Sequence, residues 1–359
     1  MIILVISILL IMVCFILKRS DFFGGLLLVW LWILFGWSYG NADYANYLYK
    51  YSHIDSLGNN FEILDVGVTK LSNLVGLDYK HFLILFSAIF IIAIFYFTKK
   101  NTENWCFVIA LYTISPFMLD VVQIRNSMAL IFIWLGLDAL INYKRKIDLV
   151  RFVSCVIVAS MFHSASIIFL LILFPFFLER HDVIVVTSII ITVGILATRF
   201  LGNILFHIST FLNMSERYSM YAYQGVEINA RKVLIIITLF ITFEIGILII
   251  RNSQELSRNA DLNFTNFVEK MNIIMLVVIP ITSILPDAYR MMESLMLVNF
   301  ILLGRAMDTM HSKYVLSINE GRLRLCGAVT AMLNITILVF SSVNINTVFY
   351  PLIYHNLLF

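Results

Sequence analysis

Two arginines stand where apolar runs of the sequence begin. Arg125 lies in LDVVQIRNSMAL and Arg290 in PDAYRMMES, each at the expected N-terminus of a membrane helix. Such a terminus presents unpaired N–H groups and the positive end of the helix dipole, and a guanidinium adds a fork that matches two phosphate oxygens. Two such arginines would suit a diphosphate. The alternative for either one is snorkelling towards the interface, or an ion pair with Asp120, Asp287 or Glu293.

A histidine interrupts the longest apolar segment. Residues 149–178 are too long for one span, and the polar residues His163 and Ser164 divide them into two halves. Histidine titrates close to neutral pH, so a histidine at a chain reversal could act as a base or as a neutral donor. The alternative is a hydrogen-bonded structural histidine. Asp43 and Glu62 are further candidate bases, and the residues alone do not rank the three.

The stretch 39–81 is much richer in polar residues than the runs around it. Asp43, Tyr47 and Tyr51 follow one another at a spacing of four, which places them on one face of a helix, with Tyr44 beside them. Carboxylates and flat rings suit sugars, whose hydroxyls donate to carboxylates and whose C–H faces lie on rings. The alternative is a belt of interfacial tyrosines. Further along, an apolar stripe at helical spacing predicts a helix in the interface plane.

A second polar stretch, 201–232, has a similar composition. An apolar helical face leads into SERYSMYAYQG, which carries Arg217, Tyr218 and Tyr221. An interfacial helix followed by a tyrosine-rich loop could form a lid or the rim of a sugar site. The alternative is an anchor in the interface without a binding role.

Composition assigns these groups to a membrane protein. Of the 359 residues, 61% are apolar and 13% are charged, whereas a soluble domain carries roughly 25% charged residues. The length allows roughly ten spans of about 20 residues. A net charge of +3 gives no reason to expect nucleic acid as a partner. The four cysteines lack metal-ligand spacing, so we expect neither a zinc site nor a disulfide framework.

The apolar runs predict an all-α, polytopic membrane protein with a single transmembrane domain over 1–359. We expect about 11–12 transmembrane helices or half-helices, with interfacial helices on the external side. The first run starts directly after Met1 and predicts a retained helix rather than a cleaved signal. The predicted segments are 2–17, 22–38, 82–97, 105–119, 127–142, 149–178, 183–200, 233–250, 268–285, 288–304 and 325–342.

Lysine and arginine set the expected orientation, because cytoplasmic loops of membrane proteins carry an excess of both. If the loop with Lys18 and Arg19 is cytoplasmic, most of the 25 lysines and arginines share that side, provided that 149–178 is a hairpin or a re-entrant pair. Both termini then lie outside. The two polar stretches and the two arginine turns are also external, and any chemistry is expected there.

The order of these motifs resembles a known family. Asp43-Tyr44, the acidic loop with Glu62, QIRNSMAL, MFHSAS, ERYSMY and AYRMMESLML follow one another between apolar runs. This order is similar to that of the Wzy/EpsG-type polysaccharide polymerases, which join lipid-linked repeat units of O-antigen, capsule or exopolysaccharide. The resemblance covers about residues 38–305. It departs from the family pattern at Asn126, where glutamine is expected after the arginine.

The resemblance implies a metal-independent glycosyltransferase with a GT-C-like architecture. A growing glycan would pass from undecaprenyl diphosphate to a lipid-linked repeat unit at the external face of the bacterial inner membrane, without a cofactor. The implied partners are undecaprenyl-diphosphate-linked oligosaccharide, the lipid bilayer and a regulator of chain length.

The resemblance also suggests roles for the candidate residues. Arg125, Arg290 and Arg217 would hold the diphosphate, because a leaving anion must be stabilised. His163 comes first among the bases, because a break within the membrane would place it near a lipid-borne diphosphate. One alternative is a flippase or transporter of the same oligosaccharide, for which repeats and charges throughout the bilayer depth are expected. Another is an O-antigen ligase-like transferase, which differs mainly in its acceptor.

Overall fold

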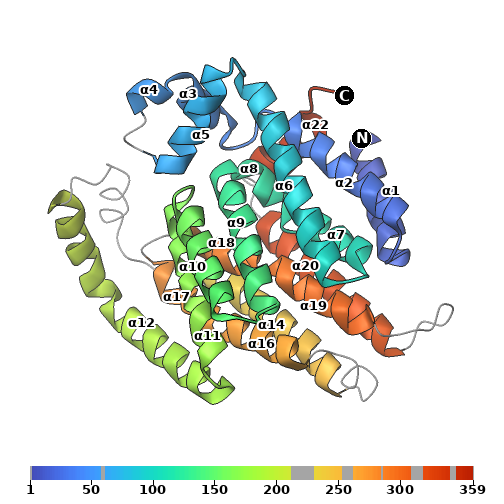
Figure 1. Ribbon diagram of the computed structural model, residues 1–359, viewed down its shortest axis with the longest axis vertical. Helices are drawn as coiled ribbons and strands as arrows, with labels where there is room; N and C mark the ends of the chain where they lie inside the picture. Colours follow the sequence, from blue (N-terminus) through green and yellow to red (C-terminus); the bar gives the residue numbers. More distant parts are fainter. Residues whose placement is uncertain are drawn as a thin grey trace. The chain divides into compact units, whose positions relative to one another are not determined.

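The computed structural model describes residues 2–57, 61–211, 230–252, 262–283, 286–308, 318–339 and 345–358 (Figure 1). Throughout these residues the regular secondary structure consists of helices, which confirms the all-α prediction. The chain divides into two compact units. Unit 1 comprises Met1–Leu170, Ile249–Ala260 and Leu297–Phe359, and unit 2 comprises Leu171–Leu248 and Asp261–Met296.

Unit 1 contains most of the helices. They are α1 (Ile2–Ile16), α2 (Asp21–Gly36), α3 (Tyr44–Ser52), α4 (Ile54–Leu57), α5 (Ile63–Leu74), α6 (Tyr79–Asn101), α7 (Trp105–Ile114), α8 (Phe117–Val122), α9 (Ile124–Ile141), α10 (Lys146–Ser160), α19 (Met296–Asp308) from its second residue, α20 (Ile318–Val339), η4 (Ile345–Phe349) and α22 (Tyr350–Tyr354). The 3₁₀ helix η2 (Ser164–Ile172) and α14 (Ala230–Asn252) have residues in both units.

Six described helical stretches are long and apolar enough to cross a membrane: Tyr79–Asn101, Ile124–Ile141, Arg180–Ala197, Ala230–Asn252, Leu262–Ile281 and Asn319–Leu338. Shorter apolar stretches are Ile2–Ile16, Asp21–Gly36, Trp105–Ile114 and Ser164–Phe177. These helices agree with a multi-pass membrane protein. The number of full-length spans in the described residues is smaller than the sequence suggests, because several apolar runs are divided into shorter helices.

A proline divides the predicted segment 105–119. Helix α7 ends at Ile114, and Ser115 has an extended backbone (φ −164°, ψ 134°) directly before Pro116. The proline ring disfavours a helical conformation of the preceding residue and removes one N–H donor. Helix α8 therefore starts anew, and the next start, at α9, places Arg125 in a first helical turn.

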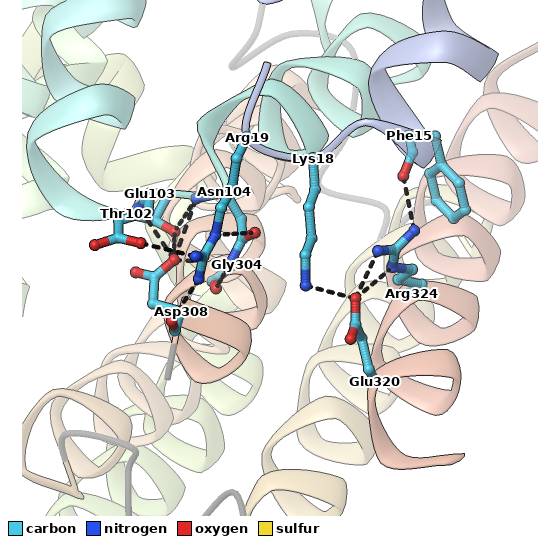
Figure 2. Close-up of polar contacts among 10 residues, drawn as sticks. All are labelled: Phe15, Lys18, Arg19, Thr102, Glu103, Asn104, Gly304, Asp308, Glu320 and Arg324. Carbon is cyan, nitrogen blue, oxygen red and sulfur yellow. Dashed lines mark hydrogen bonds and ion pairs between the residues drawn. The ribbon is translucent and has the colours of Figure 1, made fainter. Parts of the chain in front are cut away.

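Ion pairs join the segment after α1 to α20 in unit 1 (Figure 2). Lys18 Nζ lies 2.6 Å from Glu320 Oε1. The same carboxylate accepts a hydrogen bond from Arg324 Nε at 3.1 Å, and Arg324 Nη1 donates to Phe15 O at 3.1 Å. The end of α1 and the start of α20 are therefore held together by charged groups.

Asp308 is the centre of a second polar cluster at the same end (Figure 2). Its Oδ1 accepts hydrogen bonds from Thr102 Oγ1 at 2.9 Å, from Glu103 N at 3.0 Å and from Asn104 Nδ2 at 2.7 Å. Arg19 Nε donates to Asn104 Oδ1 at 3.3 Å. The C-terminal ends of α1, α6 and α19 thus lie at one end of unit 1.

We expect the substitution Asp308→Ala to destabilise the protein, because it removes the acceptor of the buried Thr102 hydroxyl, of Glu103 N and of one Asn104 Nδ2–H. Each orphaned buried donor costs about 1–3 kcal/mol, so the apparent Tm in detergent should fall by about 5 °C or more. Glu103→Ala is the matched control. Its side chain is 69% exposed in a surface ion pair with Arg19, so its Tm should change by less than about 2 °C. Equal shifts in both variants would contradict this explanation.

The stretch after α2 lies at the opposite end of unit 1. Helix α2 begins at Asp21, which accepts a hydrogen bond from Trp105 Nε1 at 3.0 Å, and it runs away from the Lys18 end. Beyond α2, Tyr39 N donates to His355 O at 3.1 Å. Figure 1 shows the short helices α3, α4 and α5 at this end. Residues 39–57 and 61–81 are therefore separated from the loop with Lys18 and Arg19 by the length of α2 (Figure 1).

The predicted break in the segment 149–178 is confirmed. Helix α10 ends at Ser160, His163 N donates to Ala159 O at 2.9 Å, and the chain resumes as η2 at Ser164. Leu64 N, in the first turn of α5, donates to Met161 O at 3.0 Å. The break and the polar stretch 39–81 are thus joined directly.

Unit 2 is built around α12 and α16. Its described helices are α11 (Leu173–Phe177), α12 (Arg180–Phe211), most of α14, α16 (Leu262–Met275), α17 (Val278–Ile281), η3 (Pro286–Tyr289) and α18 (Arg290–Ser294). Arg180 Nε lies 2.8 Å from Oε1 of the buried Glu269. A Cβ at Gly194 would lie 2.8 Å from the Pro280 ring, so α12 and α17 approach closely there.

Candidate active site

An ion pair between two distant segments forms the centre of the site. Arg125 Nη1, in the first turn of α9, lies 2.7 Å from Oε2 of Glu62, the residue before α5. Both side chains remain 18% exposed, so solvent or a ligand can reach the pair. Asp120, which the sequence offered as a partner for Arg125, instead accepts a hydrogen bond from Tyr112.

The break between α10 and η2 contributes a third segment of the chain to the site. Ser164 N and Ser164 Oγ each donate to Glu62 Oε1 at 3.2 Å. The neighbouring His163 lies close enough to the Glu62 carboxylate for their charges to interact. The structure therefore brings together Arg125, Glu62 and His163, which come from three separate parts of the sequence.

A second ion pair is enclosed next to the first. Lys50 on α3 pairs with Asp65 on α5, and their side chains are only 6% and 2% exposed. Phe61 lies between the two pairs: Lys50 Nζ is 5.0 Å and Arg125 Cζ is 5.7 Å from its ring centroid. Cations are attracted to the face of an aromatic ring, so this ring helps to hold both positive groups in place.

Tyr47 adds a neutral hydroxyl to the cluster. It interacts with the Arg125 guanidinium, and the charge of Asp43 also acts on it. Burial raises the pKa of Tyr47, with the nearby carboxylates adding to this and Arg125 opposing it. The phenol therefore stays protonated at neutral pH. Asp43 directly precedes α3, and its N–H donates to Asn41 Oδ1 at 3.2 Å.

The charges of the cluster set the protonation of Glu62. Burial raises the pKa of Glu62, whereas the Arg125 guanidinium, backbone N–H groups including that of Ser164, and His163 lower it, and the lowering prevails. Glu62 is thus an ionised carboxylate at neutral pH. Burial also lowers the pKa of Lys50 and raises that of Asp65, against the attraction of each for the other.

We expect Lys50→Met to destabilise the protein by about 3–5 kcal/mol, because it leaves Asp65 buried without its partner. The double variant Lys50→Met/Asp65→Leu should recover most of that loss. Because the pKa of Asp65 is already raised in the folded state, the single variant should lose less stability at pH 5 than at pH 8, where the carboxyl is charged. The measurement is the apparent Tm in detergent at both pH values. A double variant as unstable as the single one would contradict the ion-pair explanation.

The other tyrosines of α3 differ in how accessible they are. Tyr51 is 6% exposed, and its hydroxyl donates to Leu77 O at 2.9 Å. Its ring packs against Tyr79 at 5.6 Å and Phe82 at 5.3 Å between centroids. Tyr44, which is half-buried, packs edge-on against Tyr79 at 5.4 Å. Packing therefore explains Tyr51 better than sugar binding does, whereas Tyr44 and Tyr47 remain candidates.

In unit 2, two cations approach one aromatic ring. Arg290 is the first residue of α18, and its Cζ lies 5.8 Å from the centroid of the Tyr289 ring. Lys232 Nζ, from the first turn of α14, also lies 5.8 Å from this ring. Ser294 Oγ donates to Arg290 O at 2.9 Å. Arg290 is thus held at the start of a short helix, with a lysine nearby that the sequence did not single out.

Three predicted site residues, Arg217, Tyr218 and Tyr221, lie outside the described residues. Within the described ranges there is no group of three or more His, Cys, Asp or Glu side chains that could hold a metal ion.

Sequence reasoning missed Lys50, Asp65 and Ser164 as members of the site. The available signal was weak: Lys50 follows Tyr47 by three residues and therefore shares its helix face. Asp65 follows Glu62 by three residues in the same way. Only the fold shows that these two faces meet.

The fold and this cluster define a multi-pass helical membrane protein with a charged, solvent-reachable site at one end of unit 1, opposite its basic loops. Residues 21–352 match the model of the EpsG family, and the chain belongs to this family of Wzy-type polymerases. Comparison with curated proteins gave no match, and comparison with solved structures gave none.

Proposed function

We propose that the protein transfers a growing glycan from undecaprenyl diphosphate to a lipid-linked repeat unit. The observation that carries this proposal is the meeting of Arg125, Glu62 and His163 from three segments. A reachable guanidinium suits a diphosphate leaving group, and a histidine beside it suits an acceptor hydroxyl. Membership of a polysaccharide polymerase family supports the same class of reaction.

The proposed reaction is a substitution at C1 of the donor sugar. The acceptor hydroxyl oxygen forms a bond to C1, while the bond from C1 to the diphosphate oxygen breaks. The hydroxyl proton passes to a base, and the diphosphate leaves with the bonding electrons. We assign the base to His163, with Asp43 and Glu62 as the alternatives. The proposed diphosphate contacts are Arg125, Arg290 and Arg217.

The proposed sugar contacts are aromatic. Tyr44 and Tyr47 are the best candidates, because both are half-buried on α3 and Tyr47 interacts with the Arg125 guanidinium. Tyr51 is a weaker candidate because of its burial. Tyr218 and Tyr221 are proposed from the sequence alone.

Arginines rather than a metal ion are proposed to neutralise the leaving diphosphate. The sequence contains no DxD-like pair of carboxylates, and a guanidinium fork can bind two phosphate oxygens at once. This proposal goes together with a GT-C-like, metal-independent mechanism.

The proposed location is the bacterial inner membrane, with the site facing the periplasm or the outside. The separation of the site from the basic loops at the Lys18 end of unit 1 supports this orientation. The proposed partners are undecaprenyl-diphosphate-linked oligosaccharide, the bilayer and a regulator of chain length.

The test supplies purified protein in detergent with lipid-linked repeat units, in the presence of a metal chelator, and separates the products on a gel. We expect a ladder that grows by whole repeats and is lost in Arg290→Ala. Arg151→Ala is the matched control, since this arginine is 62% exposed in a surface pair with Asp148, and its ladder should be unchanged.

The absence of a ladder from folded wild-type protein with the correct repeat unit would overturn the proposal. Movement of the unit across a bilayer without growth would then indicate a flippase. Attachment of a finished glycan to a lipid core would indicate a ligase.

A further inference from the structure

The two ion pairs of the site differ in accessibility. The Lys50 and Asp65 side chains are 6% and 2% exposed, whereas those of Arg125 and Glu62 are each 18% exposed. Breaking an enclosed pair leaves an uncompensated buried charge, whereas opening a solvent-reachable pair lets water replace the lost contact. The Arg125–Glu62 pair can therefore open while the Lys50–Asp65 pair stays closed.

Arg125 keeps several supports when Glu62 is removed. Its guanidinium lies 5.7 Å from the Phe61 ring centroid and interacts with the Tyr47 hydroxyl. The enclosed Asp65 carboxylate is close enough for its charge to act on Arg125. In addition, Arg125 Nε is buried and has no hydrogen-bond partner among the described residues. The Arg125 guanidinium is thus held in place by neighbours other than Glu62, and its Nε–H has no acceptor among the described residues.

Glu62 also has a second set of partners. Its Oε2 faces Arg125, whereas its Oε1 accepts hydrogen bonds from Ser164 N and Ser164 Oγ, both at 3.2 Å. The carboxylate can leave the guanidinium without losing every donor. A guanidinium can donate to the oxygens of either a carboxylate or a phosphate. Arg125 Nη1, which donates to Glu62 Oε2 in this structure, could therefore donate to a phosphate oxygen instead.

We propose that Glu62 is a built-in competitor for the anion site of Arg125, displaced towards Ser164 when the diphosphate group of a substrate binds. This inference rests on the proposed function and deepens it, because it makes Glu62 a regulator of access. A site that is open for only a fraction of the time binds its ligand more weakly by that fraction. Glu62 would thereby weaken the binding of every anion at Arg125 by the same factor.

The test measures binding to the purified full-length chain in detergent and magnesium-free buffer. The probes are inorganic diphosphate and farnesyl diphosphate. We expect Glu62→Gln to bind at least one of them about tenfold more tightly than wild type. A gain with both probes identifies the diphosphate group as the recognised feature, and a gain with farnesyl diphosphate alone shows that the prenyl chain is needed. Unchanged or weaker binding of both probes would overturn the inference.

Asp55→Asn is the matched control, because it removes the same charge from a surface pair with Lys70, in which the Asp55 side chain is 91% exposed. Its affinity for either probe should stay within about twofold of wild type, and a gain equal to that of Glu62→Gln would overturn the inference as a general charge effect. Adding Arg125→Ala to Glu62→Gln should remove the gain.

The ladder assay separates this inference from the proposed function. A polymer made by wild type, without tighter binding in Glu62→Gln, would overturn only the inference. Tighter binding in Glu62→Gln, with no polymer from folded wild type, would overturn only the polymerase proposal.

Discussion

Replacing Arg125 with alanine is expected to lower the rate of polymer formation at least about a hundredfold, comparable to the loss of one oxyanion-binding donor. The guanidinium lies at ion-pair distance from Glu62, 2.7 Å between Nη1 and Oε2. Removing it takes away a proposed contact to the leaving diphosphate. It also leaves the carboxylate of Glu62 facing the position of an anionic group, so both effects act against the transition state.

The measurement is the initial rate of ladder growth in proteoliposomes with saturating repeat units. Arg125→Lys retains the charge but loses the fork, so we expect an intermediate rate. Arg151→Ala should match wild type, since its pair with Asp148 is at the surface. A rate for Arg125→Ala within threefold of Arg151→Ala would remove Arg125 from the proposed site.

The local polarity of the sequence predicted the chain break after α10 and the position of the basic loop after α1 at one end of the helices. His163 and Ser164 interrupt an apolar run, and burying their polar groups in the middle of a regular helix would be costly. Lys18 and Arg19 mark a loop that must lie away from the apolar core of the bilayer. Each of these two predictions depends only on a few consecutive residues and not on how distant segments pack, and both agree with the structure.

The contacts of the site could not be predicted in the same way. Arg125 and Glu62 are separated by 63 residues, and Glu62 and Ser164 by 102. No periodicity connects positions so far apart, because the contact depends on how α5 docks against α9 and the break. Lys50 and Asp65 are only 15 residues apart, yet they lie on different helices whose relative placement is set by tertiary packing.

Helix length was overestimated where hydropathy was the only guide. The run 105–119 is mostly apolar, but Pro116 divides it for steric reasons that a hydropathy average does not contain. Tyr51 shows a related difficulty. Its spacing from Tyr47 predicts the helix face correctly, whereas its burial depends on Tyr79 and Phe82, which lie on another helix.

The protonation state of Glu62 bears on which residue is the base. A general base is most effective when its pKa is near the working pH. The Arg125 guanidinium and backbone N–H groups hold the pKa of Glu62 below its usual value despite its burial. Glu62 is therefore a weak base in the closed pair, and this favours the neighbouring His163 for that role.

We expect His163→Ala to lower the rate of ladder growth about 10²- to 10⁴-fold, the range typical of a lost general base. Glu62→Gln, which changes the adjacent carboxylate without removing the histidine, should lose less than tenfold. A base must be unprotonated to accept a proton, so the wild-type rate should fall in acid, and the residual rate of His163→Ala should lack that decline. The measurement is the pH–rate profile of both variants, with the apparent Tm as the control for folding.

If His163→Ala keeps the wild-type rate while Glu62→Gln loses it, Glu62 is the base, its low pKa notwithstanding. If both variants remain active, Asp43→Asn becomes the decisive substitution.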